Sequence, residues 1–188
     1  MSVCKSAWYH LFSIGKIRNY ITPEQAKSVV HAYVTSKLDL NNALLAGAPL
    51  VITAKLQRIQ NAAAKLIVRS KKRDHVTPIL HKLHWLPIHQ RVIFKLLLMT
   101  FKALNGIGPA YLRDLLIFYR PTRALRSASD SLLLVVPKSR LKTYGDRSFS
   151  VMAPALWNEL PFNIRSCQTV RAFKSSLKTL LFKQHFKD

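Results

Sequence analysis

The sequence predicts a mainly α-helical protein: a helical bundle followed by a helical subdomain that carries a small β-hairpin. Three observations favour this fold class. Apolar residues recur at helical spacing over most of the 188 residues, and proline and capping residues stand where helices would begin. One segment, LLLVVP, is rich in strand-forming residues and closed by a proline. A hydrophobic content of 49% is typical of a chain that folds.

Residues 1–70 are expected to form three helices. The tetrapeptide TPEQ, beginning at Thr22, has the pattern of a capping box with proline at the first helical position. We therefore expect a helix from Thr22 to near Gly47, with Leu40 and Leu44 facing inward. The following helix, ITAKLQRIQNAAAKLIVR, is strongly amphipathic, and its apolar arc adjoins a cationic arc formed by Lys55, Arg58, Lys65 and Arg69.

A basic linker at residues 71–77 is expected to separate this region from a second α-rich subdomain, residues 78–188. The stretch RSKKRDHVTP concentrates cations before Thr77 and Pro78 start a new helix. The cations of this stretch are Arg69, Lys71, Lys72 and Arg73.

The second subdomain is expected to begin with a long helix from Pro87 to about Leu104 that carries Arg91, Lys95 and Lys102 on one outward stripe. A short helix should follow Pro109, and two more should form at APALWNEL and TVRAFKSSLKTLLF. In the last of these, Arg171, Lys174 and Lys178 lie beside the apolar face. Strands are expected near 132–136 and 141–150, the second of them around Tyr144 and Gly145, packed on the helices because two strands alone would be marginal.

The charge balance favours a polyanionic partner. Thirty Lys and Arg residues against eight Asp and Glu residues give a formal charge of +22, and a compact chain best tolerates this self-repulsion beside an anion. Nucleic acid is the first candidate and an anionic membrane surface the second. No membrane span is expected, because lysines interrupt the longest apolar stretch. Two distant cysteines and a poor secretory signal predict an intracellular protein, nuclear or cytoplasmic, with a mitochondrial location as the alternative.

The histidines of HKLHWLPIH raise the question of a metal site. His81, His84 and His89 lie within nine positions, with His75 upstream, but the nearest acids are Asp74 and Asp114 and the segment Trp85–Pro87 should bend the chain between the ligands. We therefore expect neither a metal nor another cofactor. The eight acids are dispersed singly and no catalytic motif is present, so we do not expect an enzyme.

Aromatic side chains are candidates for stacking on bases. At helical spacing among aliphatic residues, however, aromatic rings are more often part of the core. We therefore expect the following five residues to be core: Trp8, Tyr9, Tyr33, Phe101 and Trp157.

Four stretches of the chain strongly resemble the C-terminal part of non-LTR (LINE-type) retrotransposon reverse transcriptases. They are KSAWYHLFSIGKIRNYITPEQAKSVVHAYVTSKLD, LQRIQNAAAKLIV, KKRDHVTPILHKLHWLPIHQRVIFKLLLMTFKALNGIGPAYL and LVVPKSRLKTYGDRSFSVMAPALWNELP. The resemblance runs from about Val3 to Phe186, and LHWLPI, ALNGIGPAYL and KTYGDRSFSVMAPALWNELP occur in the family's order and spacing. The chain departs from the family in LDLNNALLAGAP, where the family usually has LDYCNSLLYGLP.

The resemblance implies that residues 3–69 are similar to the three-helix thumb that follows the polymerase palm, and residues 75–188 to the segment beyond it. The palm with its YxDD aspartates and the endonuclease would lie outside this chain, which is therefore expected to bind RNA or DNA backbone without catalysis, with an element-encoded polymerase as a further expected partner. The oligomeric state stays open. The expected contacts to phosphates are Lys55, Arg58, Lys65, Arg69, Lys71, Lys72, Arg73, Arg91, Lys95 and Lys102.

Two other classes of protein fit the same charge. A helical RNA-binding protein of a ribonucleoprotein would share the basic helix faces. A peripheral membrane protein would use the same amphipathic helices on an anionic bilayer.

Overall fold

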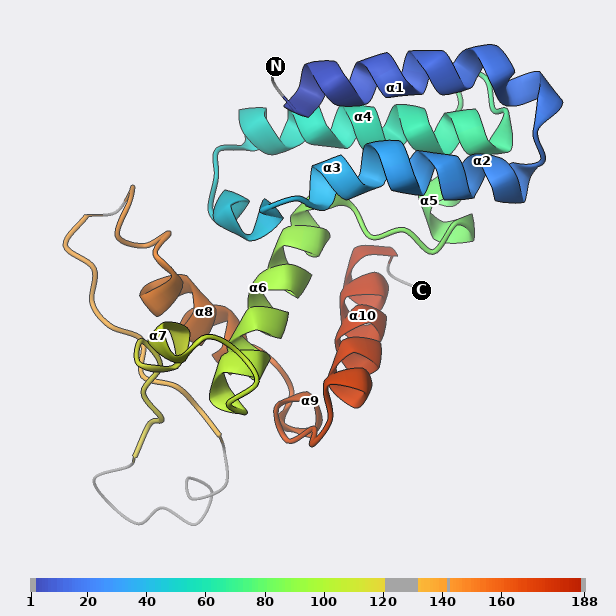
Figure 1. The fold of residues 1–188 in the computed structure, drawn as a ribbon. Helices are drawn as coiled ribbons and strands as arrows, with labels where there is room; N and C mark the ends of the chain where they lie inside the picture. The colour runs from blue at the N-terminus through green and yellow to red at the C-terminus, as the bar shows by residue number, and fades with distance from the viewer. Residues whose placement is uncertain (1–2, 121–131, 142, 187–188) are drawn as a thin grey trace. The chain divides into compact units, whose positions relative to one another are not determined.

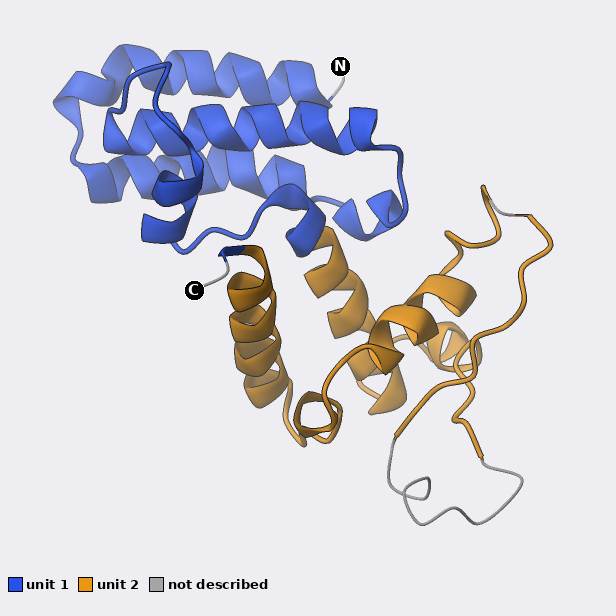
Figure 2. Cartoon of the chain, turned by 180° about the vertical axis from the view of Figure 1, so that it is seen from behind, with its two compact units in different colours: residues 1–91, 186–188 blue, residues 92–185 orange. Residues whose placement is uncertain are grey.

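A computed structural model describes residues 3–120, 132–141 and 143–186 of the chain (Figure 1). These residues are mainly helical, which confirms the predicted fold class, and they contain no β-strand apart from one isolated bridge between Phe118 and Leu134. The chain divides into two compact units (Figure 2). Unit 1 comprises residues 1–91 and 186–188, and unit 2 comprises residues 92–185.

Unit 1 is built on three helical rods that lie side by side (Figure 1). The first is α1 (Val3–Ile17), the second runs from α2 through a π-helical segment into α3, and the third is α4. Alanines at the crossings let the rods approach closely: Ala7, Ala26 and Ala64 are fully buried. The remaining bounds in unit 1 are η1 (Arg18–Tyr20), α2 (Pro23–Val30), η2 (His31–Thr35), α3 (Ser36–Asp39), η3 (Asn42–Leu45), α4 (Leu50–Val68) and α5 (Thr77–Lys82).

The second rod begins as the sequence predicts and ends earlier. Thr22 and Gln25 form the capping box, because the Gln25 N–H donates to Thr22 Oγ1 over 3.3 Å and the Thr22 N–H donates to Gln25 Oε1 over 2.9 Å. The rod ends at Asp39, since Leu40 is extended, with φ of −66° and ψ of 119°, and Asn41 then adopts a left-handed conformation with φ of 54°. The prediction that the helix continues to near Gly47 with Leu40 and Leu44 facing inward was therefore wrong, and both leucines are exposed.

The motif HWLPI is held against α4 by two glutamines. The Gln60 side chain donates to the Leu86 carbonyl over 2.8 Å, and Gln57 Oε1 accepts from the Ile88 N–H over 2.8 Å, at the first turn of α6 (Ile88–Leu104). Trp85, Leu86 and Ile88 are buried. The motif is therefore a packing feature, and it fixes the start of α6 near Pro87, as predicted.

Unit 2 has an aromatic centre contributed by three helices. The Phe101 and Phe173 rings stack with centroids 4.3 Å apart, and Trp157 lies 5.9 Å from Phe173. All three side chains are almost fully buried. The helices of unit 2, besides most of α6, are α7 (Ala110–Arg113), α8 (Phe149–Asn158), α9 (Phe162–Arg165) and α10 (Val170–Phe186).

The predicted hairpin is wrong in the part of the chain that the structure describes. Segment 132–136 pairs with residues 117–119 through two hydrogen bonds, from the Tyr119 N–H to the Leu133 carbonyl and from the Val135 N–H to the Ile117 carbonyl, each 2.8 Å. On its other side the Asn158 amide takes the place of a second strand. Its Oδ1 accepts from the Leu134 N–H over 2.9 Å and its Nδ2 donates to the Leu134 carbonyl over 2.8 Å.

In the predicted second strand, Leu141 and residues 143–150 form a tight turn and then the start of α8, not a strand. The Gly145 N–H donates to the Leu141 carbonyl over 2.8 Å, and the Ser148 N–H donates to the Gly145 carbonyl over 3.0 Å. A Cβ at position 145 would lie 2.7 Å from the Leu141 carbonyl oxygen, so the turn requires glycine. Tyr144 and Gly145 thus interrupt extended structure, which explains why the apolar residues nearby do not pair as a strand.

Candidate nucleic-acid interface

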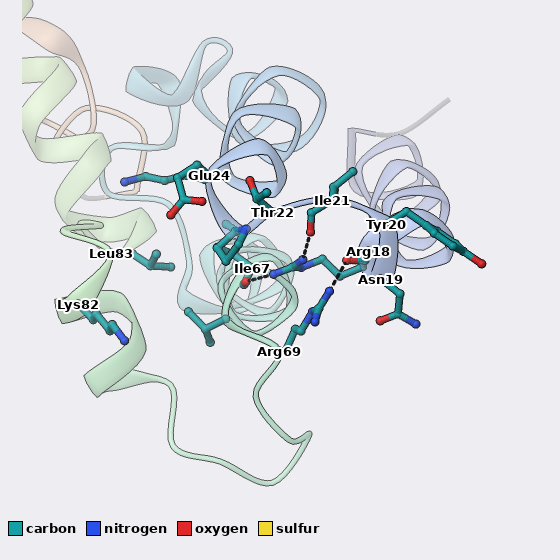
Figure 3. A pocket seen from close by; sticks show the side chains of 13 residues that line it. Arg18, Asn19, Tyr20, Ile21, Thr22, Glu24, Ile67, Arg69, Lys82 and Leu83 are labelled. Atoms are coloured by element: carbon teal, nitrogen blue, oxygen red, sulfur yellow. Dashed lines mark hydrogen bonds between the residues drawn. The ribbon is translucent and has the colours of Figure 1, made fainter.

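A pocket of about 830 Å³ in unit 1 lies where the end of α1, the end of α4, the start of α2 and α5 meet (Figure 3). We call it the basic pocket. Four cations line it, and one acid, Glu24, does so as well. The cations come from four separate segments of the chain: Arg18, Lys27, Arg69 and Lys82.

Arg18 is the structural centre of the basic pocket. Its side chain is buried and donates to three carbonyls: Nε to Leu66 over 2.9 Å, Nη2 to Ile67 over 2.6 Å and Nη1 to Ile21 over 2.8 Å. Leu66 and Ile67 are in the last turn of α4, where carbonyls lack the N–H groups of a following turn, and the Leu66 carbonyl also accepts from the Arg69 N–H over 3.4 Å. Arg18 therefore caps α4 and places a positive charge at the negative end of its dipole.

Arg69 completes a reciprocal contact with Arg18. It follows α4 in the left-handed conformation with φ of 54°, and its Nη2 donates to the Arg18 carbonyl over 2.9 Å (Figure 3). The predicted site residue Arg69 thus lies at the rim of the basic pocket and also ties α4 to the end of α1. Lys27 and Lys82, which the sequence interpretation did not select, are exposed on the same pocket.

The turn between α4 and α5 displays three predicted site residues together. The Asp74 carboxylate accepts from the Lys71 N–H over 2.7 Å, and the Asp74 N–H donates to the Lys71 carbonyl over 3.1 Å. This closed turn leaves Lys71, Lys72 and Arg73 exposed, and we call these three residues the basic turn. Lys65 supports it, because its Nζ donates to the Lys72 carbonyl over 2.8 Å.

Lys55 and Arg58 continue the cationic surface along α4. Both are exposed, and with Lys65 and Arg69 they fall within about 80° of one helical face at 100° per residue. At about 1.5 Å per residue, Lys55 lies roughly 20 Å along the axis from Arg69. We call Lys55, Arg58, Lys65 and Arg69 the α4 stripe, and it ends at the basic turn.

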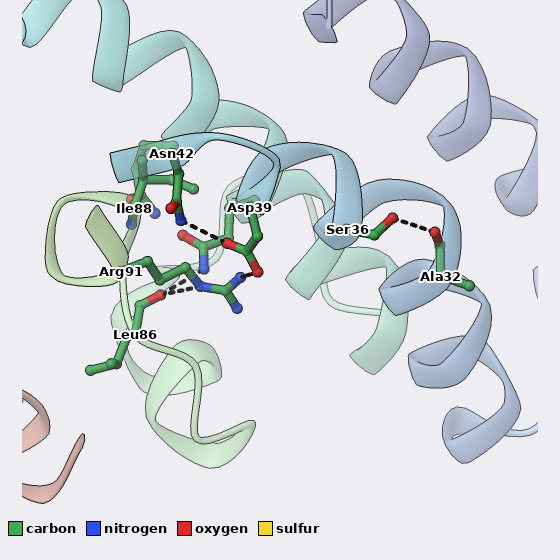
Figure 4. A network of polar contacts seen from close by, with 9 residues as sticks. Ala32, Ser36, Asp39, Asn42, Leu86, Ile88 and Arg91 are labelled. Carbon is green, nitrogen blue, oxygen red and sulfur yellow. Dashed lines mark hydrogen bonds and ion pairs between the residues drawn. The ribbon is translucent and has the colours of Figure 1, made fainter. Parts of the chain in front are cut away.

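Arg91, which is predicted to lie on the phosphate-binding stripe of its helix, makes several contacts within the protein. Its Nη1 is 2.7 Å from Asp39 Oδ2, its Nε donates to the Leu86 carbonyl over 3.0 Å, and its guanidinium lies 5.8 Å from the Trp85 ring centroid (Figure 4). Asn42 Nδ2 donates to the other Asp39 oxygen over 3.3 Å. Arg91 therefore links the end of α3 to the start of α6.

In unit 2, Lys95 is exposed and Lys102 is partly buried on α6. A groove of about 600 Å³ is lined by Phe94 and by the α10 stripe that the sequence showed beside the apolar face. The cations of this α10 groove are Arg171, Lys174 and Lys178, all exposed.

Burial lowers the pKa of the Arg165 guanidinium from its ordinary value, but an arginine keeps its proton at neutral pH.

The histidines do not converge. The rings of His81 and His84 lie 6.5 Å apart, and His81 contacts Phe186. Among the residues that the structure describes, no group of three or more His, Cys, Asp and Glu side chains is placed to hold a metal ion.

Within the described part of the chain, no helix has the length and apolar character needed to cross a bilayer.

Comparisons of the chain with protein-family models, with curated proteins and with solved structures found no match.

Proposed function

We propose that this chain binds the sugar-phosphate backbone of RNA or DNA through the basic turn, the basic pocket and the α4 stripe, without a covalent step. The observation that carries the proposal is the gathering of exposed cations from separate segments at one end of unit 1. Contacts of this kind set affinity and register and carry little sequence information. The role agrees with the thumb of non-LTR retrotransposon reverse transcriptases, which residues 3–69 resemble.

The charge balance supports the proposal. Eight acids can neutralise at most eight of the thirty Lys and Arg side chains. At the basic end of unit 1, the Asp74 carboxylate is engaged in closing the turn through the Lys71 N–H. An approaching row of phosphates would therefore meet cations that protein carboxylates leave largely uncompensated, and counterion release would drive binding.

The test measures binding of a fluorescent duplex oligonucleotide by anisotropy over a range of salt concentrations. If six to ten phosphates are engaged, affinity should fall by about 10³ to 10⁵ between about 50 and 200 mM salt. The triple variant K71Q/K72Q/R73Q should lower the salt slope by up to about 0.9 for each contact removed. A matched control, R113Q/K138Q/R140Q, removes the same charge from exposed residues of unit 2.

The control variant should bind much more tightly than the basic-turn variant. Equal losses in the two variants would mean that net charge alone drives binding, and would contradict the proposed interface. A wild-type affinity that does not change with salt would contradict backbone binding itself.

A further inference from the structure

The outer face of α1 is both aromatic and cationic. Lys5, Tyr9, Phe12 and Lys16 follow one another at spacings of four, three and four residues, which places them on one side of the helix. The opposite side, formed by Ala7, Leu11 and Ile14, is buried. Tyr9 and Phe12 are 65% and 68% exposed, and Trp8 at the edge of the face is 47% exposed. We call Lys5, Trp8, Tyr9, Phe12 and Lys16 the aromatic face.

This exposure overturns part of the sequence prediction. Phe101 and Trp157 are core as expected, whereas Trp8, Tyr9 and Tyr33 are exposed. Large aromatic side chains bury substantial apolar area when a partner covers them. A cluster of them in water therefore indicates a surface whose burial against a partner is favourable in free energy.

Neighbouring rings extend this surface toward the second rod. The Tyr9 and His10 rings are 5.5 Å apart in an edge arrangement, and His10 lies 5.4 Å from Tyr33 in the π-helical segment η2. Lys16 Nζ lies over the Phe12 ring, 4.9 Å from its centroid, so a cation and an aromatic ring are already in contact on this face. π-helical turns are frequent at functional sites.

We propose that the aromatic face binds unpaired bases of single-stranded nucleic acid. Its chemistry matches both parts of that ligand. The flat aromatic rings can stack on the bases, and Lys5 and Lys16 lie where the phosphates on either side would pass. The first 23 residues contain no acid, so nothing on α1 repels an anionic chain. A duplex conceals the faces of its bases, so the aromatic face should distinguish single strands from duplexes, which the basic turn does not.

This inference takes its class of partner from the proposed function but depends on different residues. The natural reporter is Trp8, because the other two tryptophans, Trp85 and Trp157, are only 7% and 1% exposed. A short oligothymidylate should quench the tryptophan fluorescence of the wild type. An abasic oligonucleotide of equal length, with the same phosphates, should quench it far less, and W8F should lose the quenching.

The affinity test compares the wild type with Y9A/F12A and with the control Y111A, which removes an exposed ring from α7. Stacking on aromatic side chains changes affinity by about 5- to 150-fold for each base. Y9A/F12A should weaken oligothymidylate binding by a factor in that range and leave abasic and duplex binding within about twofold. Far-UV circular dichroism checks that both variants fold.

The outcomes separate the two proposals. If Y9A/F12A binds oligothymidylate as the wild type does, or loses abasic and duplex binding equally, the aromatic face is not a base-stacking site, whatever the salt dependence of duplex binding shows. Loss of binding to vesicles of phosphatidylcholine and phosphatidylglycerol in Y9A/F12A, with oligonucleotide binding unchanged, would assign the aromatic face to a bilayer and overturn the inference. If the wild type binds no oligonucleotide at all, both proposals fail.

Discussion

Arg18 and Lys72 are both cations in a basic region, yet the structure uses them differently. Arg18 is 5% exposed and its guanidinium is engaged with the carbonyls of Leu66, Ile67 and Ile21. Lys72 offers its carbonyl to Lys65 and leaves its own ammonium exposed. Composition counts the two equally, but only the second type is available to a phosphate.

Replacing Arg18 should therefore lower stability more than replacing an exposed arginine. In Arg18→Met the carbonyls at the end of α4 lose charge-assisted hydrogen bonds, and we expect the free energy of unfolding to fall by roughly 2–4 kcal/mol. Arg58→Met, on the exposed face of the same helix, should change it by less than about 0.5 kcal/mol. Urea denaturation followed by circular dichroism measures both variants. Similar midpoints for the two would show that the Arg18 contacts contribute little.

At the residue scale, the sequence identifies the cations but not the groups that their side chains contact. Arg18 reaches carbonyls 48 and 49 positions away, and Arg91 reaches Asp39 across 52 positions. No local pattern reports a contact of that separation. The basic turn was found because its cations are adjacent in sequence and the turn is closed locally by Asp74.

At the scale of elements, local signals predicted helix starts well and helix ends less well. The capping box at Thr22, Pro78 in the first turn of α5 and Pro87 just before α6 lie at the helix starts that they indicate. The second rod ends at Asp39 because Leu40 is extended and Asn41 is left-handed, and sequence periodicity does not reveal either conformation. Periodicity also identifies the two sides of α1, but which side is covered depends on the neighbouring rods.

The failed hairpin shows how a side chain can replace a strand. The Asn158 amide presents an N–H donor beside an oxygen acceptor, as backbone peptides do, and it satisfies both polar groups of Leu134. The sequence shows an apolar extended segment at 132–136, and its partners are residues 117–119 on one side and Asn158 of helix α8 on the other. A pattern of apolar residues predicts extension more reliably than it predicts the partner.

Asn158→Asp should test this pairing with almost no change in size. The variant loses the Nδ2 donor to the Leu134 carbonyl and places a carboxylate oxygen against that carbonyl, so we expect a loss of about 1–3 kcal/mol in the free energy of unfolding. Asn163→Asp, at an exposed position of α9, is the control. Hydrogen exchange at the Leu134 amide should accelerate in the first variant only. Unchanged protection there, together with an unchanged free energy of unfolding, would show that the Nδ2 donor to the Leu134 carbonyl does not hold segment 132–136.

At the scale of the whole molecule, the net charge of +22 sets a cost that folding must overcome. The cations are closer together in the compact state than in the unfolded chain, so their mutual repulsion destabilises the folded state. Salt shortens the range of this repulsion to about 10 Å at 0.1 M and about 3 Å at 1 M. A polyanion that binds the folded state would counter the same repulsion and add its binding free energy.

The thermal midpoint should therefore rise with sodium chloride concentration. A gain of roughly 1–2 kcal/mol corresponds to about 2–8 °C for a chain of this size, and circular dichroism melts in low and moderate salt measure it. A short oligonucleotide at 100 times its dissociation constant should add about 2.7 kcal/mol in low salt, and much less in high salt, because salt weakens its binding. R113Q/K138Q/R140Q, which carries three fewer charges, should show a smaller response to sodium chloride and keep the response to the oligonucleotide. A midpoint that falls with salt would mean that attractive charge pairs outweigh the repulsion, and the excess of cations would then no longer argue for an anionic partner.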